Sequence, residues 1–309
     1  MKKVVFLGSP DFAAEIFSYL LQRDDLAVIA LVCQADKKVG RHQEIQITPT
    51  KKLALARQIP VFQPVKISDD FQELINLPFD LMISCAYGQF LPQQLLDRGV
   101  MNIHASLLPK YRGGAPIQRA LMAGEKESGI SLMQTVMKMD AGPVYCQKAL
   151  PIDINDTYSS LQTRLIDCAK ALLADKLEAI LKGELKPLEQ DAEQVSFAPI
   201  IKAKDELIDF QRPALLVYNQ IRALIATPVG HGLIKGKKIK FHEAKLINET
   251  KPGKAGEILG LVADGLEIAC QSGSVAISCL QPEGKQKMGA KEFFNGQGKD
   301  LVGWLFNEA

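Results

Sequence analysis

Short, continuous runs of hydrophobic residues alternate with helical patterns through the first third of the chain. Runs of this length without polar interruption are typical of strands that are covered on both faces, as in parallel sheets. Between the first two runs, Phe12, Ile16 and Leu20 repeat at helical spacing, and Ser9 or Asp11 is the expected N-cap. The alternation of strand and helix predicts an α/β fold with a Rossmann-like, mostly parallel sheet. The hydrophobic runs are residues 4–7, 26–32, 59–61 and 81–86.

The pattern changes after an amphipathic helix that is predicted over residues 159–181. Residues 185–210 are polar and interrupted by proline, as linkers are. After a further expected helix over 213–225, short strands separated by glycines predict a small β-barrel of the oligonucleotide-binding (OB-like) type. The predicted strands are residues 238–243, 256–262, 266–270 and 275–280. We therefore predict an α/β domain over 1–184, a linker over 185–210 and a barrel domain over 211–309.

Composition agrees with an ordinary globular protein of two domains. The chain has 309 residues, of which 47% are hydrophobic and 23% are charged. Its six cysteines are at least nine residues apart, a spacing that fits neither a metal site nor a disulfide framework, and we expect no metal. The first hydrophobic run is too short for a signal peptide, and no later run is long enough to cross a membrane. We expect a cytoplasmic protein.

Positive charge is concentrated in two places, although the net charge is only +2. Residues 33–51 show neither helical nor strand periodicity, and this predicted loop carries Lys37, Lys38 and Arg41. Residues 231–254 hold seven lysines against two glutamates, whereas 205–309 as a whole is nearly balanced. Contact with a phosphate backbone requires such local charge. The alternative is that both stretches are solvated surface.

Polar residues gather after the fourth predicted strand. Asn102 and His104 are two residues apart, so on an extended segment they point to the same side. Turn signals follow at 106–109 and 112–114, and Asp140 ends another strand-like run. Polar groups at strand ends are the usual place for chemistry in open α/β sheets. A carboxylate there could hold the imidazole, and such a site could move an acyl group and a proton without metal. A single histidine on a strand, by contrast, is more often a core residue.

These motifs together resemble the folate-dependent formyltransferases. The resemblance rests on Asn-x-His at 102–104, on Ser-Leu-Leu-Pro-x-x-Arg-Gly-x-x-Pro at 106–116, and on Asp140, 36 residues after His104. It implies that Asn102, His104 and Asp140 are catalytic and that 10-formyltetrahydrofolate is the co-substrate. Asn102 would donate to the oxyanion, His104 would carry the proton, and Asp140 would fix the imidazole tautomer. The folate-binding residues would be Tyr87, Gly88, Gln89, Ser106, Leu107, Leu108 and Pro109.

The opening Gly8-Ser9-Pro10 lacks the three glycines of a dinucleotide-binding turn, which argues against NAD. It resembles instead the family members that formylate the α-amine of methionyl initiator tRNA. In those, a basic loop contacts the tRNA acceptor end, and Arg41 would lead that contact. After Arg41, however, the loop continues as His-Gln-Glu, which is less basic than usual in the family. The tRNA-binding residues would be Lys37, Lys38, Arg41, Lys235, Lys237 and Lys238.

Other functions remain as alternatives. A formyltransferase acting on a sugar-nucleotide amine is similar in size, but it would have little use for the basic loop. The purine-pathway formyltransferase, which the Asp-x-Gly-Pro-Val at 140–144 resembles, has no second domain. A tRNA-binding protein with a decayed catalytic domain would not be expected to keep all three polar residues. We expect formyl transfer to initiator methionyl-tRNA by a monomer.

Overall fold

The computed structural model describes residues 1–39, 43–226, 228–247 and 253–308. They form two compact units, each of which takes in several stretches of chain. The first unit contains Met1–Pro116, Glu127–Pro151 and Gln162–Pro199. The second unit contains Ile117–Lys126, Ile152–Leu161 and Ile200–Ala309. Within the described residues, no helix is both long and apolar enough to cross a membrane.

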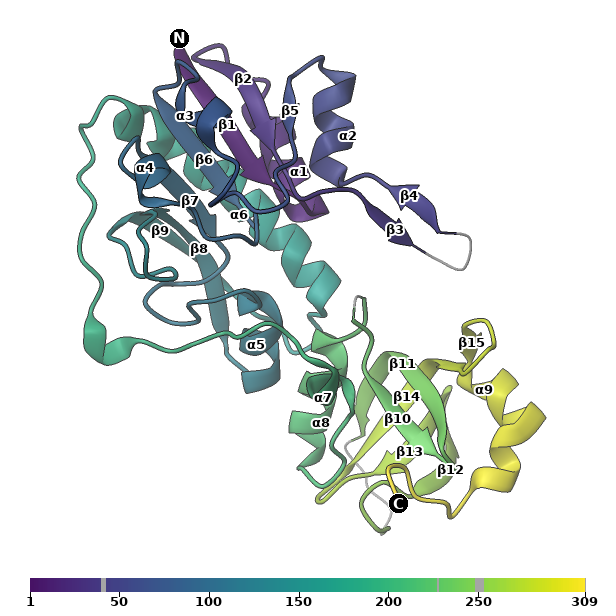
Figure 1. Ribbon diagram of the computed structural model, residues 1–309. Helices are drawn as coiled ribbons and strands as arrows, with labels where there is room; N and C mark the ends of the chain where they lie inside the picture. The colour runs from purple at the N-terminus through teal and green to yellow at the C-terminus, as the bar shows by residue number, and fades with distance from the viewer. Residues whose placement is uncertain (40–42, 227, 248–252, 309) are drawn as a thin grey trace. The chain divides into compact units, whose positions relative to one another are not determined.

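The first unit is built on a seven-stranded sheet with the order β5-β2-β1-β6-β7-β8-β9 (Figure 1). The strands from β5 to β7 run parallel, whereas β8 and β9 are each antiparallel to their neighbours. The prediction of a mostly parallel Rossmann-like sheet is therefore confirmed. Its strands are β1 (Lys2–Gly8), β2 (Leu26–Val32), β5 (Val61–Phe62), β6 (Leu81–Cys85), β7 (Val100–His104), β8 (Glu127–Gln134) and β9 (Val144–Pro151).

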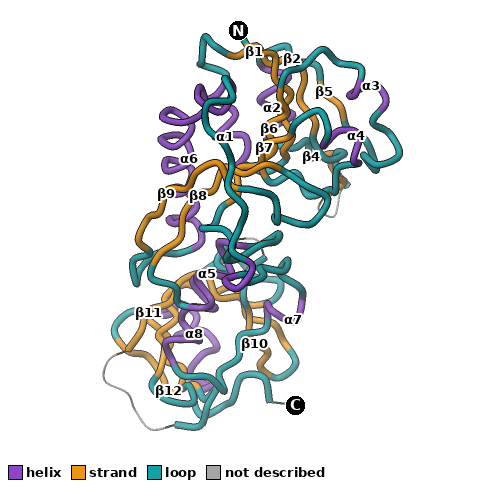
Figure 2. Tube along the Cα trace, turned by 90° about the vertical axis from the view of Figure 1, so that its left-hand side faces the viewer, coloured by secondary structure: helices purple, strands orange, loops and turns teal. Residues whose placement is uncertain are grey.

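Helices cover both faces of this sheet: α1 and α6 lie on one side, and α3 and α4 on the other (Figure 2). Because side chains alternate along β1, Phe6 stacks on Phe17 of α1 with 4.3 Å between ring centroids, while Val5 and Leu7 join the opposite core. The expected cap of α1 is wrong: Pro10 occupies the N-cap without a side-chain bond. The helices are α1 (Asp11–Leu20), α2 (Pro49–Ala56), α3 (Gln72–Ile75), α4 (Gln93–Leu96) and α6 (Tyr158–Leu181).

The stretch predicted as a loop over 33–51 contains a small hairpin of β3 (Lys37–Val39) and β4 (Glu44–Gln46), which projects from the first unit (Figure 1). Its second strand is exposed along its whole length. A strand that buries neither face has no reason to alternate hydrophobic and polar residues, so the sequence pattern could not reveal it.

The second unit is an antiparallel sheet with the order β10-β11-β14-β13-β12, in which β15 also pairs with β14. The rings of Phe210, Phe241 and Phe306 pack together in its core. This confirms the predicted small β-barrel, although β10 was not predicted. Its strands are β10 (His231–Ile234), β11 (Lys237–Ile247), β12 (Ile258–Val262), β13 (Gly265–Ala269), β14 (Ser274–Pro282) and β15 (Met288–Gly289). Its helices are α5 (Pro116–Ala123), α7 (Ala203–Glu206), α8 (Ala214–Ala223) and α9 (Ala290–Phe293).

The chain after α9 connects the two edge strands of this sheet. Ile258 of β12 donates its N–H to Trp304 O over 3.0 Å and accepts from Gly303 N over 2.9 Å. Asn307 donates its N–H to Leu233 O of β10 over 2.7 Å. Residues 303–307 thus occupy backbone groups that an open sheet would leave unpaired at both edges.

Two short segments from the middle of the chain complete the second unit. Arg222 of α8 is buried, and its Nη1 donates to the carbonyls of Asp153 and Asp156 over 3.0 and 2.8 Å. Burial lowers the pKa of this guanidinium. Arg119 of α5 forms an ion pair of 2.8 Å with Asp205 of α7. The unit therefore depends on residues 117–126 and 152–161 as well as on the chain after 200.

Residues 185–199, the first part of the predicted linker, are docked on the first unit by backbone hydrogen bonds. Leu188 and Val144 exchange two such bonds of 2.8 and 2.9 Å. Further along, Arg112 donates its N–H to Ser196 O over 2.9 Å and accepts from Ala198 N over 2.7 Å. This segment is therefore part of the first unit's structure.

Candidate active site

The structure brings the three predicted catalytic residues together. Val100 of β7 packs in the core on the α3 and α4 side, so Asn102 and His104 point to that side as well. Asp140 reaches them from the connection between β8 and β9. His104 Nδ1 lies 3.7 Å from Asp140 Oδ2, and Asn102 Nδ2 lies 3.5 Å from Asp140 Oδ1. His104 is buried, whereas the other two are partly exposed.

A main-chain group holds the carboxylate of Asp140. The N–H of Gly113 donates to Asp140 Oδ2 over 2.8 Å, which is the short length typical of a bond to a charged acceptor. Gly113 has φ +132°, and a β-carbon there would lie 2.4 Å from the carbonyl oxygen of Ala198. Only glycine fits this position, so the Arg-Gly pair of the sequence motif has a structural reason.

A second main-chain group fixes the tautomer of His104. Its Nε2 lies 3.0 Å from the carbonyl oxygen of Tyr111. A carbonyl oxygen only accepts, so Nε2 carries the proton of the neutral ring and Nδ1 presents its lone pair toward Asp140. The sequence interpretation expected Asp140 to fix the tautomer of His104. In the structure, the Tyr111 carbonyl is the group that fixes it. A proton that arrives at Nδ1 would therefore lie between the ring and the carboxylate.

The Ser106–Pro109 loop is fixed by a buried serine of β8. Ser131 Oγ donates to Ser106 O over 2.6 Å and accepts from Leu108 N over 3.1 Å. Gln147 of β9 donates its Nε2 to both Ser131 Oγ and Leu108 O, over 2.8 Å each. Ser106 and Leu108 are buried, and Leu107 packs against Gly129. The side chains of this loop are therefore used mainly in packing.

The side chains of Tyr87 and Gln89 are also occupied by the fold. Tyr87 is buried in the core beside α4, burial raises the pKa of its hydroxyl, and none of the described residues is a hydrogen-bond partner for it. The Gln89 carboxamide accepts from Ile67 N over 2.9 Å. Gly88 has φ +84° and Ala86 has φ +48°, so the chain turns sharply here, with both residues exposed, while the carbonyl of Tyr87 accepts from Gln34 Nε2 over 3.1 Å. A ligand at this place would be read mainly by main-chain groups.

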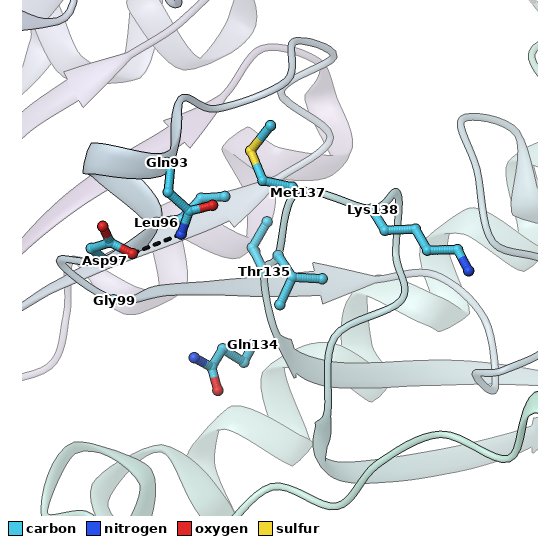
Figure 3. A pocket seen from close by; sticks show the side chains of 9 residues that line it. Gln93, Leu96, Asp97, Gly99, Gln134, Thr135, Met137 and Lys138 are labelled. Atoms are coloured by element: carbon cyan, nitrogen blue, oxygen red, sulfur yellow. Dashed lines mark hydrogen bonds between the residues drawn. The ribbon is translucent and has the colours of Figure 1, made fainter.

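A hollow that sequence reasoning missed lies between α4 and the segment that leads to Asp140 (Figure 3). Its cavity volume is about 620 Å³. In Figure 3, Gln93, Leu96 and Asp97 lie on one side of it and Thr135 and Met137 on the other, while the side chain of Lys138 extends away from α4. Met137 and Met139 are 54% and 48% exposed, which is unusual for methionine, and this exposure is visible only in the structure. None of the predicted folate-binding residues lines the hollow.

The predicted tRNA-binding residues fall into two groups, one on each unit. Lys37 and Lys38 are exposed on β3, whereas Arg41 lies outside the described residues. Lys235 lies in the turn between β10 and β11, with its ammonium 3.6 Å from the ring centroid of Trp304. Lys237 is exposed at the start of β11, and Lys238 follows it partly buried. Within the described part of the chain, no cluster of three His, Cys, Asp or Glu side chains could hold a metal ion.

Family comparisons agree with this architecture. The formyl transferase family model matches residues 1–177, and the model for the formyl transferase C-terminal domain matches residues 200–298. Fold and sequence thus define a formyl transferase. At full length, the chain is 41% identical to the methionyl-tRNA formyltransferase of Streptococcus thermophilus, covering 100% of both chains, and 41% identical to that of Streptococcus gordonii, covering 98% of both. The chain belongs to the methionyl-tRNA formyltransferase family.

Solved structures share the fold at lower identity. HypX from Aquifex aeolicus in complex with tetrahydrofolic acid has a TM-score of 0.66 and 17% identity, over 98% of this chain and 48% of that one. An N-formyltransferase from Helicobacter canadensis, in complex with folinic acid and dTDP-3-aminofucose, has a TM-score of 0.68 and 21% identity, over 91% of this chain and 100% of that one. At these identities the likeness concerns the fold alone.

Proposed function

We propose that this protein transfers the formyl group of 10-formyltetrahydrofolate to the α-amine of methionyl initiator tRNA. The observation that carries the proposal is the convergence of Asn102, His104 and Asp140 in a member of this family. In the reaction, the amine nitrogen bonds to the formyl carbon, the bond from that carbon to N10 breaks, and one proton moves from the amine to N10. An α-amine of pKa about 8 is partly neutral at pH 7, so it needs no strong base. The demanding parts of the reaction are to stabilise the oxyanion and to move the proton to N10.

In this proposal, the side-chain amide of Asn102 donates to the oxyanion that forms on the formyl oxygen. Its 3.5 Å separation from Asp140 is too long for a strong hydrogen bond, so the N–H groups are available for another acceptor. One well-placed donor of this kind contributes roughly 3–4 kcal/mol to transition-state stabilisation.

His104 accepts the proton of the attacking amine at Nδ1 and releases it toward N10. The Tyr111 carbonyl keeps the other ring nitrogen protonated, which leaves Nδ1 free for this step. The carboxylate of Asp140 faces the resulting imidazolium and stabilises its charge. Proton transfer by a positioned group typically accelerates a reaction by roughly 10²–10⁴-fold.

The folate has two candidate contacts in the first unit. The hollow beside α4 has the size of ordinary small-molecule pockets, and its lining segment continues directly into Asp140. The exposed turn at Gly88 would offer main-chain groups to a flat, amide-rich ring, and the loop over Ser106–Pro109 forms a rigid wall. The fold is shared with HypX, whose structure contains tetrahydrofolic acid.

For tRNA, the two lysine groups supply the charge. Lys37 and Lys38 stand on the projecting hairpin, and Lys235, Lys237 and Lys238 lie on the turn and strand of the barrel. Trp304 is 45% exposed beside Lys235, and an exposed aromatic ring next to cations is a surface on which an unpaired base can stack.

The proposal is tested by following radiolabelled formyl groups from 10-formyltetrahydrofolate to charged initiator tRNA and, separately, to sugar-nucleotide amines. We expect rapid transfer to the tRNA and negligible transfer to the amino sugars. Transfer to an amino sugar with none to tRNA would overturn the proposal in favour of the sugar-nucleotide formyltransferases, to which this fold is also similar.

A further inference from the structure

The carboxamide of Gln190 connects two loops of the candidate active site. Its Nε2 donates to the carbonyls of Asp140 and Gly142, over 2.9 and 2.7 Å. Its Oε1 accepts from Nε and Nη2 of Arg112, over 3.0 and 2.8 Å. A carboxamide has two N–H donors and two lone pairs, so Gln190 is fully used in these four bonds.

The groups on either side of Arg112 are those that act on the reacting residues. The preceding residue, Tyr111, supplies the carbonyl that binds His104, and the following one, Gly113, supplies the N–H that binds Asp140. Gln190 therefore joins the loop that orients both side chains to the turn that carries Asp140.

The turn of Asp140 needs such support because its backbone is strained. Asp140 has φ +47°, a left-handed conformation that is unfavourable for residues with a β-carbon. Gly142 packs so closely that a β-carbon there would lie 1.9 Å from Gln134 O. Met137 and Met139 just before the turn are exposed, so the approach to Asp140 has little packing of its own.

We propose that Gln190 is a positioning residue for formyl transfer, which holds the carboxylate of Asp140 at the imidazole of His104. This inference rests on the proposed function. It assigns a role in the chemistry to residues 185–199, the stretch that sequence analysis treats as a linker and that the structure docks on the first unit.

The main test is Gln190→Glu, which keeps the contact to Arg112 but places an oxygen against the carbonyls of Asp140 and Gly142. A misplacement near 1 Å can cost about 100-fold in rate, so we expect kcat to fall roughly 10- to 100-fold while KM for folate and for tRNA changes less than about threefold. The melting temperature is measured in parallel, because Arg112 gains an anionic partner while two donated hydrogen bonds are lost, and kcat is compared at a temperature where the variant stays folded. A kcat equal to that of the wild type would overturn the inference.

A double-mutant cycle separates this role from a general structural one. If Gln190 acts through Asp140, then adding Gln190→Glu to Asp140→Asn should lower kcat by less than about threefold more. If the fold-loss of kcat in the double variant equals the product of the losses in the two single variants, Gln190 does not act through Asp140. The matched control is Gln194→Ala, an exposed glutamine of the same segment that binds only Asp191 in the described structure, and it should leave kcat unchanged.

The experiment also distinguishes failure of this inference from failure of the proposed function. If the wild type does not formylate charged tRNA, the proposed function fails whatever the variants do. The link that Gln190 makes between Arg112 and the turn of Asp140 can then still be tested by amide hydrogen exchange at Gly113, whose N–H binds Asp140. We expect faster exchange at Gly113 in Gln190→Ala than in Gln194→Ala. Equal exchange in the two variants would show that Gln190 does not hold this loop to Asp140.

Discussion

At the scale of single residues, the backbone sets the state of the side chains that we propose to be catalytic. The tautomer of His104 is decided by the carbonyl of Tyr111, and the carboxylate of Asp140 is oriented by the N–H of Gly113. In the proposed mechanism this leaves Asp140 with an electrostatic role toward the imidazolium, since its 3.7 Å distance from His104 Nδ1 is longer than a hydrogen bond.

Asp140→Asn should therefore lower turnover without lowering folate affinity. The amide can still accept from Gly113, but it cannot stabilise a positive ring, and we expect the single-turnover rate to fall at least about 100-fold. Rapid-quench formyl transfer measures the rate, and fluorescence titration measures folate binding. The control Asp80→Asn, at an exposed site whose carboxylate accepts from Lys3 N of β1, should keep the wild-type rate. A normal rate in Asp140→Asn would remove Asp140 from the mechanism.

Some of this site could be predicted from sequence and some could not. Asn102 and His104 face the same side because the two-residue period of a strand is a local property. Asp140 lies 36 residues after His104, and only the resemblance to a family linked the two. The contributions of Tyr111 and Gly113 are made by backbone atoms, which any residue type carries, and that of Gln190 depends on the path of a distant segment. No pattern in the sequence indicates such contacts.

At the scale of elements, β8 supports the loop that follows His104. Ser131 is fully buried and takes part in three hydrogen bonds with the Ser106–Pro109 loop and with Gln147. The strand thus fixes the wall of the site through one hydroxyl. The period of β8 could be predicted, but this function of Ser131 could not, because the sequence does not show which distant groups a buried hydroxyl will bind.

Ser131→Ala should destabilise the protein, because the buried N–H of Leu108 and the amide of Gln147 lose an acceptor. An unsatisfied buried donor costs roughly 1–3 kcal/mol. Urea unfolding of the full chain measures the loss, and Ser128→Ala, also buried on β8, is the control that should cost less. Equal losses in the two variants would contradict the special role of Ser131.

The barrel strands carry two histidines whose burial should make this unit sensitive to acid. Desolvation lowers the pKa of His231 on β10 and of His242 on β11. Each histidine stays neutral in the folded state while the unfolded chain binds protons near pH 6.5, so stability is present above that pH and is lost as the pH falls toward the folded pKa.

We therefore expect the melting temperature of the second unit to fall between pH 7 and pH 5, and to fall less in His231→Gln. Trp304 is the only tryptophan of the chain and belongs to this unit, so its fluorescence reports the transition in the intact protein. A melting temperature with no dependence on pH in this range would contradict burial of neutral imidazoles.

At the scale of the whole molecule, lysines on both units belong to the proposed tRNA interface. If Lys38 and Lys237 each contact a phosphate, replacing either by alanine should weaken binding and reduce the slope of log affinity against log salt by about 1. Filter binding with charged initiator tRNA at several salt concentrations measures this. Lys182→Ala, an exposed lysine at the end of α6, should change neither quantity. Unchanged slopes in Lys38→Ala and Lys237→Ala would place the tRNA elsewhere.

The buried guanidinium of Arg222 limits how this protein could exchange parts with others. Its acceptors, the carbonyls of Asp153 and Asp156, are encoded well upstream of the barrel. A gene fusion that joined residues 200–309 to another enzyme would include Arg222 but not the carbonyls of Asp153 and Asp156 that accept its hydrogen bonds. A successful graft would have to bring residues 117–126 and 152–161 with it, so recombination at a single crossover point could not deliver a complete second unit.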